Sequence, residues 1–202
     1  MVKIIKRAVL LLSLILLSGA SIADEHIARV TMTTSEGAIE IELYPDKAPL
    51  TTENFLRLVD GGHLDGGSFY RVVTYDNDNG KPKIEVIQGG LGGDGPFEPI
   101  GHETTAQTGI LHKDGVISMA RGAVGTASSE FFICIGDQPG LDYGKTRNAD
   151  KQGFAAFGKV VAGMDVVRRI NQLPADAPSD SEYTRGQILT DPVEIISVRR
   201  SN

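Results

Sequence analysis

Short strand-like segments recur along the whole chain, and they do not alternate with helices. In residues 30–33 and 39–43, apolar and polar side chains alternate one by one around a glycine-bearing turn, which is the pattern of a β-hairpin. The other strand-like segments are residues 68–73, 84–88, 115–119, 131–135, 156–161 and 193–198. Because helices do not separate these segments, the pattern disfavours a parallel α/β sheet and predicts a mainly antiparallel barrel or sandwich.

Two segments have the apolar periodicity of a helix. Residues 50–59 place three apolar side chains on one helical face, and Thr51 or Thr52 is expected to cap the start. Residues 164–171 form the second predicted helix. The polar loops at residues 76–83, 142–153 and 174–191 are interpreted as surface excursions rather than domain linkers.

The N-terminus has the layout of a secretory signal peptide. Three cations precede an apolar run at residues 8–17, and small residues ending in Ala23 follow. The apolar run is shorter than the roughly 20 residues of a transmembrane helix, although an uncleaved anchor is the alternative. We expect residues 1–23 to be cleaved, residues 24–202 to form one domain, and the periplasm to be its location.

The charge of the chain limits its partners. Residues 1–23 carry three cations and no acid, so their removal lowers the formal net charge from −6 to −9. Such an acidic domain is a poor match for nucleic acid or an anionic membrane surface. No pattern indicates an oligomer, so a monomer is expected. The single cysteine, Cys134, lies in an apolar run, and the four histidines lack metal-ligand spacing; we therefore expect no metal site.

A glycine motif imitates a dinucleotide-binding turn. The run GLGGDG at residues 90–95 matches G-x-G-x-x-G and follows an apolar segment. A helix must begin directly after such a turn, because its N-terminus holds the pyrophosphate. Pro96 and Pro99 exclude that helix, so the run is interpreted as a tight turn that leaves a strand.

Arg71 lies inside the strand-like run SFYRVV. It could simply face solvent from an exposed sheet face. Alternatively, a rigid strand could present its guanidinium to a carbonyl or carboxylate of a ligand. Phenylalanines in residues 131–132 and 154–157 could supply the dry surroundings that the second interpretation requires.

Five segments, in order, resemble one family: FYRVV, VIQGG, GVISMAR, SSEFFI and FAAFGKVVAGMDVV. Together with PDKAPLTTENFLRLVDGGHLDG they are similar to the cyclophilin-type peptidyl-prolyl cis/trans isomerases, over about residues 29–171 and the final strand. The resemblance implies a closed eight-stranded antiparallel β-barrel capped by two α-helices. With the exported N-terminus, it points to the bacterial periplasmic branch and to flexible, Pro-containing polypeptides as partners.

The resemblance also implies roles for residues of this chain. Arg71 matches the catalytic arginine, and Gln88 matches the glutamine that orients it and contacts substrate. The implied substrate-binding positions are Val86, Gln88, Ala120, Arg121, Glu130, Phe132, Leu141 and Phe154. Catalysis would use a desolvated proline pocket and a hydrogen bond from Arg71, with no cofactor.

Several positions depart from the common pattern of the family. Val86 replaces a frequent methionine, Glu130 replaces the usual glutamine, and Gly140 stands where an aromatic residue often borders the site. These changes leave open an alternative function, a module that binds proline-containing segments as a chaperone or scaffold with little catalysis.

Overall fold

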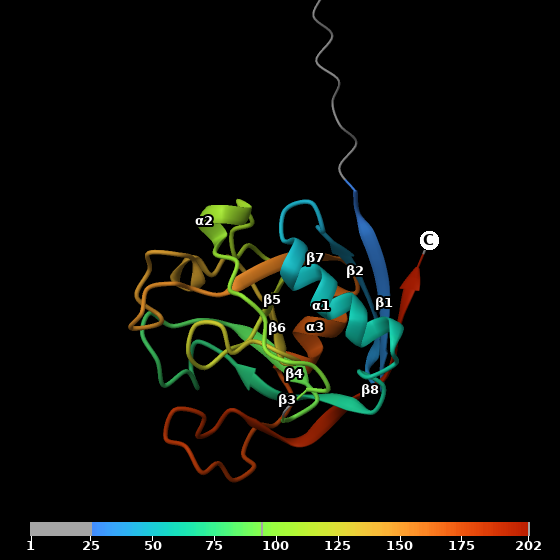
Figure 1. The fold of residues 1–202 in the computed structure, drawn as a ribbon. Helices are drawn as coiled ribbons and strands as arrows, with labels where there is room; N and C mark the ends of the chain where they lie inside the picture. Colours follow the sequence, from blue (N-terminus) through green and yellow to red (C-terminus); the bar gives the residue numbers. More distant parts are fainter. Residues whose placement is uncertain (1–25, 94, 202) are drawn as a thin grey trace, which may run out of the picture.

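The computed structural model describes residues 26–93 and 95–201, in which eight strands close into one antiparallel barrel (Figure 1). The strands are β1 (Ala28–Thr34), β2 (Gly37–Leu43), β3 (Gly67–Val73), β4 (Val86–Gly90), β5 (Val116–Met119), β6 (Phe131–Cys134), β7 (Ala155–Ala162) and β8 (Ile188–Ser201). Their order around the barrel is β1-β2-β7-β5-β6-β4-β3-β8, and β8 pairs with β1 to close it. The predicted barrel is confirmed. The predicted signal peptide lies outside the described residues.

The first two strands form the predicted hairpin. Thr34 pairs with Gly37 at the turn, and the Thr34 hydroxyl donates to the Gly37 carbonyl at 2.8 Å. Gly37 has a φ of 135°, and a Cβ there would lie 2.9 Å from the Val166 side chain. A turn with this backbone, packed this closely against a helix, therefore requires glycine.

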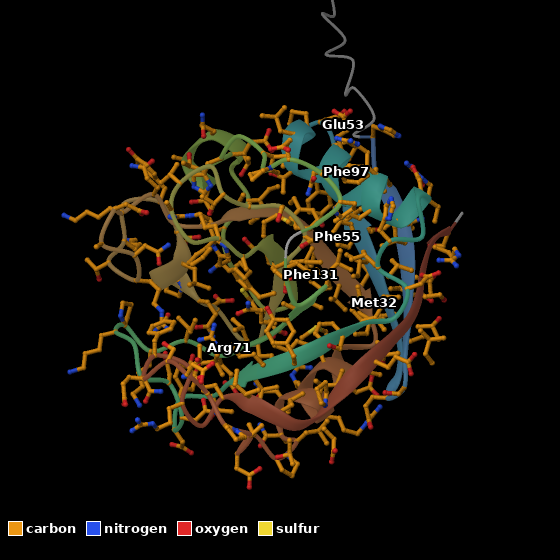
Figure 2. All side chains as sticks on the ribbon, turned by 60° about the horizontal axis from the view of Figure 1, so that its bottom comes forward. Met32, Glu53, Phe55, Arg71, Phe97 and Phe131 are labelled. Carbon is orange, nitrogen blue, oxygen red and sulfur yellow. The ribbon has the colours of Figure 1, made fainter. Side chains whose placement is uncertain are left out.

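The barrel interior is filled by aromatic and aliphatic side chains. Phe55 packs against Phe131 and Phe157, with ring centroids 5.6 and 5.2 Å apart, and Phe69 meets Phe131 at 5.7 Å. Figure 2 shows Phe55, Phe131 and Met32 inside the barrel wall, whereas Arg71 lies away from this interior. The apolar positions of the alternating strands therefore form the core, as their period predicts.

Three α-helices are present in the described chain: α1 (Pro49–Asp60), α2 (Thr105–Thr108) and α3 (Met164–Asn171). α1 and α3 were predicted; the single turn of α2 is too short to show a helical period. The prediction that Thr51 or Thr52 caps α1 is wrong. Pro49 begins the helix earlier, so Thr51 already lies inside it. The Glu103 carboxylate instead accepts hydrogen bonds from the Leu50 and Thr51 amides.

The long loops meet at one side of the barrel. The loop between β3 and β4, the loop that follows the short 3-10 helix η1 (Pro139–Leu141), and the loop between α3 and β8 lie near one another in Figure 1. Their contacts with one another, described below, build the edge of a pocket. No helix within residues 26–93 and 95–201 is long and apolar enough to cross a membrane.

Candidate active site

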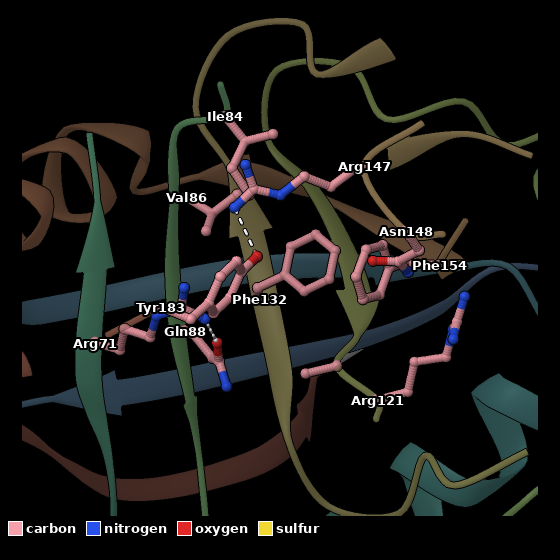
Figure 3. Close-up of a pocket in the computed structure, with 11 residues that line it drawn as sticks. Arg71, Ile84, Val86, Gln88, Arg121, Phe132, Arg147, Asn148, Phe154 and Tyr183 are labelled. Atoms are coloured by element: carbon pink, nitrogen blue, oxygen red, sulfur yellow. Dashed lines mark hydrogen bonds between the residues drawn. The ribbon is translucent and has the colours of Figure 1, made fainter. Parts of the chain in front are cut away.

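A pocket lies on the outer face of the barrel, between β3, β4 and β6 and the long loops (Figure 3). Its volume is about 230 Å³, several times the roughly 30 Å³ of one liquid water, so it admits a small ring. It is lined by Arg71, Ile84, Val86, Gln88, Ala120, Arg121, Phe132, Arg147, Asn148, Phe154 and Tyr183. Seven of the nine predicted site residues are therefore brought together here.

A β-bulge turns Arg71 toward this pocket. The pairing register of β3 with both β4 and β8 shifts between Phe69 and Arg71. Side chains two apart on a regular strand share a face, so Arg71 would follow the buried Phe69 into the core. The extra residue, Tyr70, instead puts Val72 into the core and Arg71 on the outer face. Arg71 therefore lies at a pocket and not on an exposed sheet face. This placement favours the second of the two interpretations of the sequence, in which a strand presents the guanidinium to a ligand.

The Arg71 guanidinium is held by two glutamines. Its Nη1 donates to the Gln88 side-chain oxygen at 2.8 Å, and its Nε and Nη2 donate to the Gln187 oxygen at 3.0 and 2.6 Å. These bonds account for three of its five N–H groups. Burial lowers the pKa of Arg71 from its ordinary value, yet arginine remains charged. Among the described residues it has no carboxylate partner, so its positive charge is fixed without being neutralised.

A chain of hydrogen bonds sets the orientation of Gln88. The Tyr70 hydroxyl donates its one proton to Glu130 at 2.6 Å, so it can only accept from the Gln88 Nε2, 2.8 Å away. The Gln88 oxygen must then face Arg71. Burial and the Glu130 carboxylate raise the pKa of Tyr70, which keeps that proton on the phenol.

Glu130 lies behind the pocket rather than in it, so its predicted contact with substrate is not supported by the geometry. Its Oε1 accepts hydrogen bonds from the Leu91 and Gly92 amides at 2.8 and 3.0 Å. A Cβ on Gly90 would lie 2.6 Å from the same oxygen. The glycine motif is therefore a turn folded around a carboxylate of this chain, which agrees with the tight-turn interpretation. Glu130 acts on Arg71 only through Tyr70 and Gln88.

Apolar side chains form the floor of the pocket. Phe132 and Phe154 meet edge to face, with centroids 5.2 Å apart and an interplanar angle of 88°. Val86 and Ile84 continue this surface. The arrangement is an apolar floor beside a fixed cation.

A buried polar group supports Phe132 from behind. The His112 ring stacks on Phe132 with centroids 5.9 Å apart, and it lies 2.8 Å from the Asp142 carboxylate and 3.1 Å from the Ser118 hydroxyl. Ser118, His112 and Asp142 are hydrogen-bonded in the same order as the serine, histidine and acid of a hydrolytic triad. Ser118 is fully buried, however, and it does not line the pocket, so this group positions a wall rather than a nucleophile.

Leu141 is buried beneath the pocket instead of lining it. It packs with Val73 and Cys134 in the apolar cluster under Val86 and Phe132. Leu141 was predicted to form part of the pocket wall, but it lies in the layer of side chains beneath that wall. Burial raises the pKa of the Cys134 thiol well above its ordinary value, so this cysteine is an inert part of the same cluster.

Arg121 and Ala120 border the opposite end of the pocket from Arg71. The Arg121 guanidinium is paired with Asp150 at 2.8 and 3.0 Å, and it also donates to the Gly153 carbonyl. Arg121 lowers the pKa of Asp150 to about 2. Because its charge is compensated, Arg121 contributes shape to this end rather than an open cation.

Four lining residues were missed as site residues by the sequence analysis: Ile84, Arg147, Asn148 and Tyr183. Gln187, which holds Arg71, was missed as well. Apart from Ile84, which was predicted to begin a strand, these residues belong to segments that looked like ordinary polar loops. Gly140, where the family often has an aromatic residue, does not line the pocket; it lies against Pro82, since a Cβ on Gly140 would be 2.5 Å from the Pro82 ring.

Comparisons with known proteins identify the family. A family model described as cyclophilin type peptidyl-prolyl cis-trans isomerase/CLD matches residues 29–199. The chain is 34% identical over 201 residues to a peptidyl-prolyl cis-trans isomerase of Acinetobacter baylyi, covering 96% of this chain and 95% of that protein. It is 35% identical over 179 residues to peptidyl-prolyl cis-trans isomerase A of Dickeya dadantii, covering 86% of each.

Solved structures agree on the fold. A crystal structure of a cyclophilin type peptidyl-prolyl cis-trans isomerase from Cryptosporidium parvum superposes with a TM-score of 0.67 at 20% identity, covering 88% of this chain and 99% of that one. The barrel, the order of the motifs and the relatives thus confirm the resemblance inferred from the sequence. The chain belongs to the cyclophilin family of peptidyl-prolyl cis-trans isomerases.

Proposed function

We propose that this isomerase binds a proline of a flexible, exported polypeptide in the pocket beside Arg71, and that the Arg71 guanidinium assists rotation about the preceding peptide bond. One observation carries the proposal. A charged guanidinium, fixed by Gln88 and Gln187 and lacking a carboxylate partner among the described residues, borders an apolar floor built by Phe132 and Phe154. Such a guanidinium can donate a hydrogen bond to the amide of a bound substrate.

The chemistry needs no bond to be broken. Amide resonance sets a rotation barrier of about 18–20 kcal/mol, and uncatalysed Xaa-Pro bonds isomerise in tens to hundreds of seconds. A turnover of roughly 1–10³ s⁻¹ requires the barrier to fall by about 3–7 kcal/mol. In the twisted transition state the resonance is lost and the prolyl nitrogen becomes a hydrogen-bond acceptor. Whatever binds that state more tightly than the planar amide accelerates the rotation.

The two halves of the pocket act on that state in different ways. The apolar floor excludes water, which otherwise stabilises the planar, polar amide. Arg71 donates a hydrogen bond to the prolyl nitrogen or to the carbonyl beside it. One preorganised donor in such surroundings contributes about 2.7–4 kcal/mol, so the two effects together reach the required range. Gln88 and Gln187 hold the donor in place before the substrate arrives.

The substrates follow from the export signal in the sequence. A protein delivered to the periplasm meets chains that are still unfolded, whose Xaa-Pro bonds are accessible. We propose that it acts there as a monomer, on proline-containing segments and not on nucleic acid or membrane surfaces. The negative charge of residues 24–202 supports this choice of partner.

A protease-coupled assay on an Xaa-Pro peptide tests the proposal. The wild-type protein is expected to accelerate the cis-to-trans step, and Arg71→Ala is expected to reduce that acceleration by about 100-fold or more, in line with the loss of one preorganised donor of about 2.7–4 kcal/mol. Arg168→Ala is the matched control, because Arg168 is an exposed arginine on α3 that does not line the pocket. Full activity in Arg71→Ala would refute the role of Arg71. An uncatalysed rate in the wild type, with peptide binding retained, would favour the proline-binding module instead.

A further inference from the structure

Three loops, distant in sequence, are joined at the rim of the pocket by Arg147. Its guanidinium forms a two-pronged ion pair with Asp78, at 2.7 and 2.9 Å, and donates to the Tyr183 hydroxyl at 2.7 Å. The side chains of Arg147 and Asp78 are only 2% and 0% exposed. Asp78 also accepts hydrogen bonds from the Gly80 and Ile84 amides. A buried pair with this many bonds fixes the three loops relative to one another.

Tyr183 is thereby held as a rigid aromatic wall. Its ring lies against two guanidiniums, 5.3 Å from that of Arg71 and 5.4 Å from that of Arg147. Its backbone carbonyl accepts a hydrogen bond from the Asn79 side chain. The residue is nevertheless 46% exposed and lines the pocket. Part of a fixed ring therefore remains open to whatever the pocket binds.

The two ends of the pocket differ in charge. Figure 3 shows Tyr183 and Arg71 on one side of Phe132, with Phe154, Asn148 and Arg121 on the other. The cations of Arg147 and Arg121 are neutralised by Asp78 and Asp150. Among the described residues that line the pocket, Arg71 is the one cation without a carboxylate partner, and its charge lies beside Tyr183. A substrate side chain at this end meets an aromatic surface and an unpaired cation.

We propose that Tyr183 is a specificity-determining residue: it packs against the side chain adjacent to the proline on the Arg71 side, and it favours an apolar or aromatic residue there over lysine or arginine. An aromatic side chain gains contact with the ring. A cationic side chain is repelled by Arg71 in a partly desolvated site. Because the opposite end has only compensated charges, the preference concerns one flank of the proline. This inference rests on the proposed function of the same pocket.

Peptide series that vary one flank of the proline at a time test the inference. In the wild type, phenylalanine is expected to exceed lysine by about tenfold in kcat/KM at one flank and by less than about threefold at the other. Tyr183→Ala is expected to bring the larger ratio down to about twofold, whereas Tyr183→Phe keeps most of it because the ring remains. The change should appear mainly in KM, since the contact lies outside the rotating bond.

The matched control is Tyr143→Ala. Tyr143 is also 46% exposed on a neighbouring loop, but it does not line the pocket, so its removal should leave the selectivity ratio unchanged. A second measurement needs no variant. Nuclear Overhauser contacts should link the Tyr183 ring of the wild type to the flanking phenylalanine of a bound peptide.

The outcomes separate this inference from the proposed function. Catalysis with equal ratios at both flanks, an unchanged ratio in Tyr183→Ala, or the absence of Tyr183 contacts to the bound peptide would overturn the role of Tyr183 while leaving the isomerase intact. Absence of catalysis toward every peptide in the series would overturn the proposed function itself.

Discussion

Gln187 holds the Arg71 guanidinium, and its removal provides a demanding test of how the site is built. The Gln187 oxygen accepts from both Nε and Nη2 of Arg71, and its own Nε2 donates to the Asn77 carbonyl at 2.8 Å. Gln187 is fully buried. Replacement by methionine keeps the length and bulk of the side chain but removes the acceptor. Arg71 would then stay buried with Gln88 as its remaining anchor.

The expected cost follows from these bonds. A hydrogen bond to a charged group contributes about 1.5–3 kcal/mol; since the two bonds share one oxygen, Gln187→Met should lower the free energy of unfolding by about 2–3 kcal/mol. In a domain of this size each kcal/mol lowers Tm by roughly 2–4 °C. The kcat/KM should fall by about 10–100-fold, because the donor is no longer held in place.

A double-mutant cycle in urea checks the cause. Arg71→Met removes the buried charge, so Arg71→Met/Gln187→Met should be more stable than the sum of the single losses predicts, with a coupling energy of about 2 kcal/mol. Additive effects, within about 0.5 kcal/mol, would refute the idea that Gln187 anchors Arg71. A stable Gln187→Met variant with full activity would do the same.

Two further predictions concern the ion pairs around the pocket. Asp78→Asn leaves the buried Arg147 unpaired and should lower the free energy of unfolding by about 3–5 kcal/mol, whereas Asp165→Asn, at an exposed carboxylate that is 3.6 Å from Arg169, should change it by less than about 0.5 kcal/mol; equal urea midpoints for the two variants would contradict this. The pKa of Asp150 is lowered from 3.8 to about 2 by Arg121, so its stabilising effect is complete above the unfolded-state pKa and is lost as the pH falls toward 2. Asp150→Asn should flatten the decline of Tm between pH 4 and 2, and a decline as steep as that of the wild type would rule out this contribution.

The strand-like segments in the sequence were sufficient to predict an antiparallel barrel or sandwich, and the resemblance to the cyclophilins selected the closed eight-stranded barrel that the structure has. The sequence was also sufficient for most of the pocket, since the strands that carry Arg71, Val86, Gln88 and Phe132 lie in recognisable segments. The face occupied by Arg71 was not predictable from alternation, because the bulge at Tyr70 shifts the register. That shift depends on how β3 pairs with β4 and β8, which is a property of the folded sheet.

Contacts between residues that are far apart in the sequence explain why several site residues were missed or misplaced. Gln187 and Tyr183 reach Arg71 from more than a hundred positions away along the chain, and no local pattern indicates such a contact. Glu130 follows the family pattern in position, yet its carboxylate turns to the Leu91 and Gly92 amides. An amide-rich turn attracts a carboxylate more strongly than a neutral side chain, which accounts for the orientation of Glu130 away from the pocket.

The central claim is that Arg71 lowers the barrier to rotation rather than merely helping to bind the peptide. Magnetisation-exchange NMR on an Xaa-Pro peptide saturated with protein measures the interconversion of the cis and trans forms directly on the enzyme. Arg71→Met keeps the length of the side chain and removes its donors, so its bound peptide should exchange about 100-fold more slowly than with the wild type, in line with the loss of one preorganised donor. Bound-state exchange at the wild-type rate in Arg71→Met would contradict the account.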